Sequence, residues 1–232
     1  IGIDRQNDQY LVTLQTITPS ANQKEASDQL GTVVYQDSGR SISEAIRKMS
    51  QVISRNIFLD SAEVVIVHDQ VARESGISEI IDYLILEPDI TSNIKFLISK
   101  DQTANHILTS FVPVQKVSAG RITDLLINNE KNFGSTVTIY PNYIKNHLLN
   151  KMKEIAIPYV TVAGDIEKGL SKENIEKPSP PALLKLDGMA YFKDDRLLGF
   201  LNDQDSQMYA LLEGKLKQTI IDTTCPSSEG YA

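Results

Sequence analysis

The apolar positions between residues 32 and 101 switch repeatedly between the spacing of a strand and the spacing of a helix. A short apolar run at residues 33–35 ends at the turn signal Asp37-Ser38-Gly39, and residues 42–53 then carry apolar side chains every three or four positions. Residues 64–67 are β-branched throughout, which is typical of a strand covered on both faces. A second helical pattern and a third apolar run follow. This order predicts a βαβαβ unit with parallel pairing.

The rest of the chain contains further elements, bounded by glycine, proline and polar runs. Residues 1–19 indicate one strand, or two short strands around a turn at residues 5–8, and the polar residues 20–31 are expected to form a surface loop. Helices are expected at residues 103–111, 121–131, 142–155 and 207–214, extended runs at 136–140, 159–163 and 216–221, and a hairpin at 183–201 with its turn at 193–196. In the last helix, Met208, Leu211 and Leu212 are expected to face inward.

Together these elements predict a mixed α/β fold in two domains. Residues 1–117 are expected to form an N-terminal α/β domain, in which helices flank a mixed sheet built on the βαβαβ unit. Residues 118–225 are expected to form a smaller α+β domain that contains the hairpin and a long exposed loop at residues 164–181, where glycine, proline and charged residues predominate. Residues 226–232 indicate a frayed tail.

Composition limits the class of partner. The 232 residues carry a formal net charge of -7 and have a pI of about 5.0. Nucleic-acid binding requires clustered Lys and Arg, so we expect no nucleic-acid partner. The single cysteine, Cys225, cannot form an internal disulfide. No stretch reaches the ~20 apolar residues that span a bilayer, so this portion is expected to be soluble. Because the first residue is Ile1 rather than Met, we expect the chain to be a fragment of a longer precursor.

Candidate catalytic and metal-binding residues are sparse. His68, His106 and His147 are widely separated and form no HExxH pair, so they are interpreted as structural. Glycine-rich phosphate loops and a GxSxG nucleophile elbow are absent from the sequence. The acidic residues Asp203 and Asp205 are interpreted as a helix-capping turn rather than a calcium loop. We therefore expect no catalytic residue, no cofactor and no metal.

Two apolar segments raise the question of a partner surface. The helix expected at residues 77–86 is apolar nearly all round, so it either lies between two layers or presents one face to another domain. The hairpin at residues 183–201 is rich in Leu and Phe. For both segments, burial within this chain is the favoured interpretation.

The residues from Arg55 to Ile90 resemble the C-subunit lipoproteins of spore germinant receptors, the Ger(x)C family. The stretch RNIFLDSAEVVIVHDQVARESGISEIIDYLILEPDI follows that family's signature, and two further blocks, the opening GID at residues 2–4 and DGMAYFKDDRLLGFLN at residues 187–202, occur in the family's order. The residues that carry the resemblance are Arg55, Phe58, Leu59, Ala72, Arg73, Gly76, Asp82, Gly188, Phe192 and Gly199.

The resemblance implies a non-enzymatic lipoprotein subunit that a nutrient germinant receptor needs for assembly or signalling in spore germination. It implies two membrane-spanning receptor subunits as partners, and a position on the outer face of the inner spore membrane. The lipid anchor would be carried by a cysteine upstream of Ile1 and outside this fragment, so Cys225 is not the anchor. Because family members continue into a further C-terminal domain, the chain resembles an N-terminal two-domain fragment.

Two other functions stay open at this point. Open α/β sheets often hold ligands beyond the carboxyl ends of their parallel strands, so a small-molecule or glycan-binding domain of a surface lipoprotein is the main alternative. A hydrolase that uses the dispersed acids Asp37, Asp69 and Asp101 at strand ends is the third hypothesis.

Overall fold

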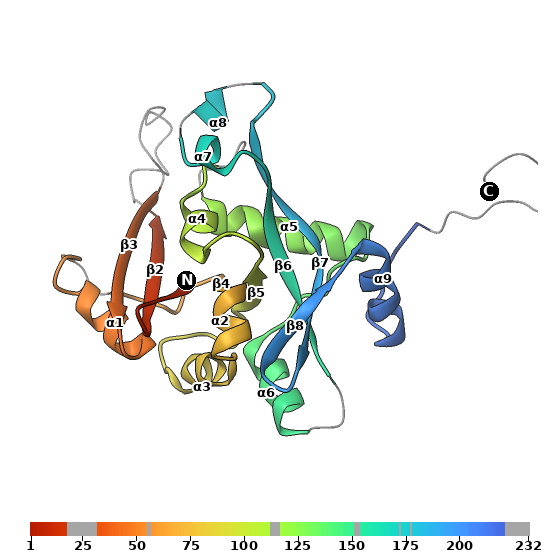
Figure 1. Cartoon of the computed structure of the whole chain (residues 1–232), viewed down its shortest axis with the longest axis horizontal. Coiled ribbons are helices and arrows are strands. Elements are labelled where there is room, and N and C mark those ends of the chain that lie inside the picture. Colours follow the sequence, from red (N-terminus) through yellow and green to blue (C-terminus); the bar gives the residue numbers. More distant parts are fainter. Residues whose placement is uncertain are drawn as a thin grey trace, which may run out of the picture.

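The computed structural model describes residues 1–17, 32–54, 57–111, 117–150, 154–171, 173–176 and 178–220. Its strands form one eight-stranded mixed sheet with the order β3-β2-β1-β4-β5-β6-β7-β8 (Figure 1). The strands are β1 (Gly2–Gln6), β2 (Gln9–Ile17), β3 (Thr32–Gly39), β4 (Val64–His68), β5 (Lys95–Ser99), β6 (Ala156–Gly164), β7 (Ala182–Lys193) and β8 (Arg196–Leu201). The prediction of a mixed α/β fold is confirmed.

The helices cover the two faces of this sheet. They are α1 (Ile42–Met49), α2 (Asp69–Glu74), α3 (Ser78–Leu86), α4 (Ala104–Thr109), α5 (Ser118–Asn132), α6 (Pro141–Leu149), α7 (Ile166–Gly169), α8 (Glu173–Glu176) and α9 (Asp203–Leu212). Helices α1, α2, α3, α6 and α9 contribute to the larger apolar core, and α4 and α5 to the smaller one. Ser41 caps α1 as the sequence indicates, because its side chain accepts a hydrogen bond from the backbone N–H of Glu44.

The strand β4 is covered on both faces, as its β-branched sequence predicts. Val65 and Val67 point into the larger core, whereas Val64 and Ile66 point into the smaller one. All four side chains are at most 1% exposed. β4 therefore separates the two cores and is the centre of the hydrophobic interior.

The position of β3 corrects the expected pairing in the βαβαβ unit. β4 and β5 do pair in parallel, but β3 forms an edge of the sheet and pairs antiparallel with β2. The first strand causes this difference: β1 lies between β2 and β4, antiparallel to one and parallel to the other. The connection through α1 thus passes over two strands before the chain enters β4.

Several expected extended runs and helix ends differ in the structure. Residues 136–140 form no strand, although Val137 and Ile139 are buried and the carbonyl of Ile139 accepts a hydrogen bond from the N–H of Phe96 in β5, at 2.9 Å. α6 ends at Leu149, so the expected helix at 142–155 is too long. Residues 216–220 also form no strand. The β-branched residues in 136–140 and 216–220 favour an extended backbone, but a strand also needs a neighbouring strand with which it can form hydrogen bonds.

The region at residues 164–181 is not simply a long exposed loop. It contains the short helices α7 and α8, and Asn174 in α8 is 2% exposed. The side-chain amide of Asn174 donates to the carbonyls of Phe111 and Ala182, and its oxygen accepts from the N–H of Ala182. A single buried amide therefore anchors part of this region, which sequence composition does not reveal.

The expected inward orientation of the large apolar residues in α9 is wrong. Met208 and Leu211 are each 55% exposed and Leu212 is 80% exposed. Ser206 and Ala210, four residues apart on one face, are the buried residues of this helix. Since these two small side chains let α9 approach the sheet closely, the larger apolar residues lie on the opposite side.

The helix α3 buries Ile80, Ile81 and Leu84, and Leu86 at its end is 77% exposed. No helix among the described residues is long and apolar enough to traverse a bilayer.

The sheet continues from β5 to β6, which belong to the two segments predicted as separate domains. The predicted division at residues 117/118 stays a prediction. The expected loop at 20–31, Arg55, Cys225 and the tail 226–232 lie outside the described residues.

Candidate functional site

The turn between α2 and α3 receives the tip of the β7–β8 hairpin. Gly76 has a φ of +80°, and a Cβ atom there would lie 2.3 Å from Oδ2 of Asp195 in the hairpin turn. The N–H of Ile77 donates to the carbonyl of Asp195 at 2.9 Å. The guanidinium of Arg196 donates to the carbonyls of Arg73, at 3.2 Å, and Glu74, at 2.5 Å. Glycine is therefore required where the hairpin contacts the helix pair.

Arg73 connects the same two segments from the helix side. Its guanidinium donates to the carbonyl of Leu198 in β8 at 3.0 Å and lies 5.4 Å from the ring centroid of Phe200. Its Nε atom is 3.7 Å from the carboxylate of Asp69 one turn earlier in α2. The signature block around residues 72–77 and the block at 187–202 are thus in direct contact, although they are far apart in the sequence.

The other glycines of the second block permit close approaches within the hairpin. Gly188 has a φ of +127°, and a Cβ atom there would lie 2.4 Å from the carbonyl oxygen of Leu201 and 2.8 Å from Oγ of Ser206. Gly199 pairs across the ladder with Tyr191, whose ring covers it. Phe192 is 1% exposed and belongs to the larger core. These positions support the fold of the hairpin and its junction with α9.

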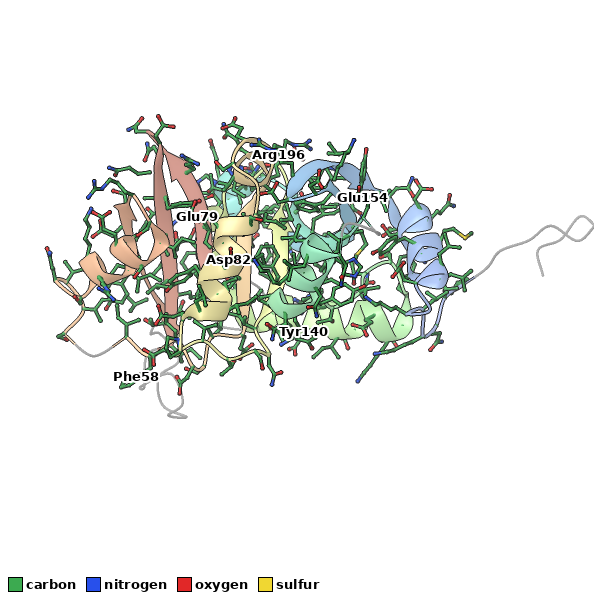
Figure 2. The ribbon with its side chains drawn as sticks, turned by 90° about the horizontal axis from the view of Figure 1, so that it is seen from below. Phe58, Glu79, Asp82, Tyr140, Glu154 and Arg196 are labelled. Carbon is green, nitrogen blue, oxygen red and sulfur yellow. The ribbon has the colours of Figure 1, made fainter. Side chains whose placement is uncertain are left out.

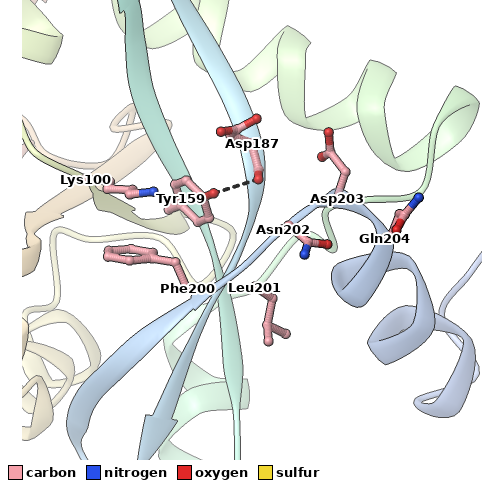
Figure 3. A pocket seen from close by; sticks show the side chains of 8 residues that line it. All are labelled: Lys100, Tyr159, Asp187, Phe200, Leu201, Asn202, Asp203 and Gln204. Carbon is pink, nitrogen blue, oxygen red and sulfur yellow. Dashed lines mark hydrogen bonds between the residues drawn. The ribbon is translucent and has the colours of Figure 1, made fainter.

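A cavity of about 400 Å³ opens beside this hairpin, at the carboxyl end of β5. Its lining includes Lys100, Tyr159, Asp187, Phe200 and Asp203 (Figure 3). Pockets of this volume hold small ligands, and the carboxyl ends of parallel strands are a common place for them. The cavity is therefore the candidate ligand site of the described structure.

Aromatic rings and charges surround the cavity. The ammonium of Lys100 lies 5.3 Å from the ring centroid of Tyr159 and 4.9 Å from that of Phe200, and the two rings meet edge to face. The hydroxyl of Tyr159 donates to the carbonyl of Asp187 at 2.7 Å (Figure 3). Burial raises the pKa of Tyr159, and the carboxylates of Asp187, Asp203 and Asp101 raise it further. Tyr159 is thus a neutral hydrogen-bond donor rather than a base.

The opening block GID lies at a separate structural junction. The carboxylate of Asp4 is buried and accepts hydrogen bonds from the N–H groups of Ala104, at 2.8 Å, and Asn105, at 3.0 Å. Burial raises the pKa of Asp4, whereas these N–H donors and the neighbouring His68 act in the opposite direction. A Cβ atom on Gly2 would lie 3.0 Å from Cδ1 of Leu108 in α4. The block therefore holds β1 against α4.

The three acids of the hydrolase hypothesis are not gathered at one site. Asp37 lies in the edge strand β3, and β2 and β1 separate that strand from β4. Asp69 begins α2 and interacts with Arg73 and with His68, whose Nε2 is 3.3 Å from it. Asp101 follows β5 with a φ of +64°. Within the described ranges, no three His, Cys, Asp or Glu side chains are placed to hold a metal ion.

Three residues of the first signature block have different environments. Leu59 is 8% exposed and packs in the larger core, whereas Phe58 is 72% exposed and points away from it (Figure 2). Phe58 lines a groove of about 530 Å³ that also includes Tyr83. Asp82 on the surface of α3 forms an ion pair with Lys145 of α6. Leu59 therefore contributes to the packing of the core, whereas Phe58 lies on the surface.

Sequence reasoning did not identify the residues that line the cavity. The sequence predicts a capping turn at Asp203, and Asn202 does accept a hydrogen bond from the N–H of Asp205 as a helix cap. Lys100 directly follows the apolar run that becomes β5, so its position at a strand end was the available signal. Tyr159 and Phe200 carried no signal, because their approach depends on the pairing of β5, β6 and β8 in the sheet.

The fold and these contacts define a mixed α/β protein in which the sequence blocks around residues 2–4, 72–77 and 187–202 hold β1 and the β7–β8 hairpin against the helices. Two family models match the chain: "Spore germination protein N-terminal domain" over residues 1–162 and "Spore germination B3/ GerAC like, C-terminal" over residues 187–232. The chain therefore belongs to the Ger(x)C family of spore germination proteins, the C subunits of spore germinant receptors. The resemblance found in the sequence is confirmed.

Sequence relatives agree with this assignment. Spore germination protein KC of Bacillus subtilis (strain 168) is 30% identical over 230 residues, which cover 96% of this chain and 56% of that protein. Spore germination protein B3 of the same organism is 20% identical over 229 residues, covering 97% of this chain and 56% of that protein. The crystal structure of the GerBC protein is similar with a TM-score of 0.49 and 15% identity, over 97% of this chain and 58% of that one. The chain thus spans a little over half the length of these proteins.

Proposed function

We propose that this chain acts within a non-enzymatic lipoprotein subunit that a nutrient germinant receptor needs for assembly or signalling. Family membership carries this proposal. It is supported by the contact between the two signature blocks, in which Arg73, Gly76 and Arg196 hold the hairpin against the helices. Of the acids Asp37, Asp69 and Asp101, which a hydrolase would require together, Asp37 lies in the edge strand β3, and two strands separate it from the paired strands β4 and β5 that the other two follow.

The proposal includes partners and a location. Its partners are the two membrane-spanning subunits of the same receptor, on the outer face of the inner spore membrane. Attachment is by a lipid anchor outside residues 1–232, since acylation together with protein contacts holds a protein stably at a membrane. The acidic balance of the chain, with a net charge of -7, supports a role without nucleic acid.

A gene deletion tests the proposal and separates assembly from signalling. In a spore former that carries the full-length gene, the gene is deleted while the genes for the two membrane-spanning subunits stay intact. We expect nutrient germination through this receptor to be lost, and complementation to restore it. Immunoblots of spore membranes then give the level of the two partners. Loss of the partners indicates assembly and their retention indicates signalling, whereas normal germination of the deletion strain refutes the proposal.

A second candidate function is the binding of a small molecule or glycan. The cavity beside Lys100 favours it, because that cavity lies at the carboxyl end of a parallel strand and combines aromatic rings with polar groups. Calorimetric titration of the chain with amino acids, sugars and cortex fragments tests it, and an absence of heat with every compound counts against it.

A further inference from the structure

We propose that the exposed apolar face of α9 is a docking surface for the part of the full-length protein that follows residue 232. This face consists of Met208, Leu211 and Leu212. The proposal rests on the proposed function in one respect, namely that the chain acts within a longer subunit, and it adds a contact inside that subunit.

The apolar face of α9 is directed away from the sheet. Met208, Leu211 and Leu212 are three and four residues apart, so they form one stripe along the helix, and each is more than half exposed. Residues 206–212 contain no charged side chain. The solvent side of a helix normally carries charged and polar residues, so an uncharged stripe of long apolar side chains indicates a contact surface.

Contacts on the other side of α9 prevent the helix from turning this face inward. The hydroxyl of Ser206 accepts a hydrogen bond from the N–H of Met189 in β7, at 2.9 Å. The hydroxyl of Tyr209 accepts one from the N–H of Ala156 in β6, at 3.2 Å. Rotation of α9 would break both bonds and would force large side chains into the space that Ser206 and Ala210 now fill. The helix therefore presents its apolar face in a fixed position.

The continuation of the protein is the occupant that these observations favour. α9 lies within residues 187–232, which match the C-terminal family model, and the chain spans 56% of spore germination proteins KC and B3. Figure 1 shows α9 at the end of the molecule opposite α1. Residues 213–232 would tether the following segment to α9, and a short tether raises its effective concentration to about the millimolar range. Three apolar side chains suffice for such a tethered contact, whereas separate proteins bury about 20–30 residues a side.

Thiol labelling of the full-length protein, produced without its lipid anchor, tests the proposal. Leu212→Cys reports on the apolar face of α9. Leu86→Cys is the matched control, because each leucine is the last residue of its helix, precedes a glutamate and has a similar exposure, 80% for Leu212 and 77% for Leu86. Both variants are also made in the 232-residue chain. Reaction with a maleimide is followed by mass spectrometry of the peptide that carries each new thiol.

The expected rates differ between the two proteins. In the 232-residue chain, the thiols of Leu212→Cys and Leu86→Cys should react at rates within about threefold of each other, because their exposures are similar. In the full-length protein, the thiol of Leu212→Cys should react at least about tenfold more slowly than that of Leu86→Cys, because only the undocked fraction reacts.

Oxidation of Met208 by hydrogen peroxide gives a second measurement, on the unmodified sequence. Met208 is exposed in this chain, whereas Met49 and Met189 are buried and serve as slow references. We expect Met208 to oxidise at least about tenfold more slowly in the full-length protein than in the 232-residue chain.

Equal labelling of the two thiols in the full-length protein overturns the proposal, as does equal oxidation of Met208 in the two proteins. Slow labelling of Leu212→Cys in the 232-residue chain also overturns it, because residues of the chain itself would then cover α9. Protection that disappears when the full-length protein is diluted indicates a second copy as the occupant and overturns it as well. The germination phenotype of the deletion strain is measured independently, so a failure of this proposal is distinguishable from a failure of the proposed function.

Discussion

Replacement of Gly188 by alanine tests whether the end of β8 and the start of α9 depend on a close backbone approach. The φ of +127° at Gly188 is unfavourable for any residue with a Cβ atom. That Cβ atom would also lie 2.4 Å from the carbonyl oxygen of Leu201, which is backbone and cannot rotate away. Ser206 Oγ, at 2.8 Å from the Cβ position, accepts a hydrogen bond from the N–H of Met189 and would have to move.

The expected loss of stability follows from these three effects. The backbone conformation costs about 1–2 kcal/mol for a residue other than glycine. Overpacking against Leu201 costs about 1–3 kcal/mol, and disturbance of the bond to Met189 costs about 1 kcal/mol. We therefore expect Gly188→Ala to lower the free energy of unfolding by about 3–6 kcal/mol, which is a large fraction of the stability of an ordinary domain.

Urea unfolding followed by circular dichroism measures this loss. With a slope of about 3 kcal/mol per molar urea, the unfolding midpoint should fall by about 1–2 M. Gly214→Ala is the matched control, because Gly214 has a φ of +65° and a Cβ atom there would have no neighbour within 4 Å. That variant should show the backbone cost alone, about 1–2 kcal/mol. A Gly188→Ala midpoint no lower than that of Gly214→Ala would refute the reasoning.

Three further predictions concern Asp4, Arg73 and α9. Because burial raises the pKa of Asp4, the folded chain keeps the proton of this carboxyl group to higher pH than the unfolded chain does. The stability of the wild type relative to Asp4→Asn should therefore decrease as the pH rises above about 4. A relative stability that increases with pH contradicts this prediction. Arg73→Met should lower the free energy of unfolding by about 1–2 kcal/mol through loss of its contacts with β8, and an unchanged urea midpoint would show that these contacts contribute nothing. Leu212→Glu should change stability by less than about 0.5 kcal/mol, whereas Ala210→Glu should prevent cooperative thermal unfolding; equal effects would mean that the buried face of α9 is wrongly identified.

The local sequence predicts whether a segment forms a helix or a strand better than it predicts which elements lie beside that segment. The runs that became β4 and the β7–β8 hairpin were recognisable because β-branched composition and turn residues act over a few positions. The edge position of β3 was not, since it depends on β1 entering the sheet between β2 and β4. Strand order is a property of the whole chain, and no local pattern records it.

The predicted orientation of α9 is wrong for a related reason. Large apolar residues usually mark the buried face of a helix, but here Ser206 and Ala210 occupy it because close approach to the sheet leaves room only for small side chains. The candidate site was missed in the same way. Lys100 lies at the end of a predictable strand, but its cavity requires Tyr159 and Phe200 to arrive from strands far along the chain.

The place of β1 in the sheet has a consequence for the kinetics of folding. The parallel pairings at the centre join residues that are far apart in the sequence, Gly2 with Ile66 and Ile98 with Tyr159. The β7–β8 hairpin, in contrast, joins neighbours around a tight turn. Chains dominated by distant pairings fold slowly, because each one closes a long loop before it gains contacts. We expect the hairpins to form before the transition state and the seam between β1 and β4 to form after it, so that substitutions in the hairpin turns slow folding while those in this seam chiefly raise the rate of unfolding.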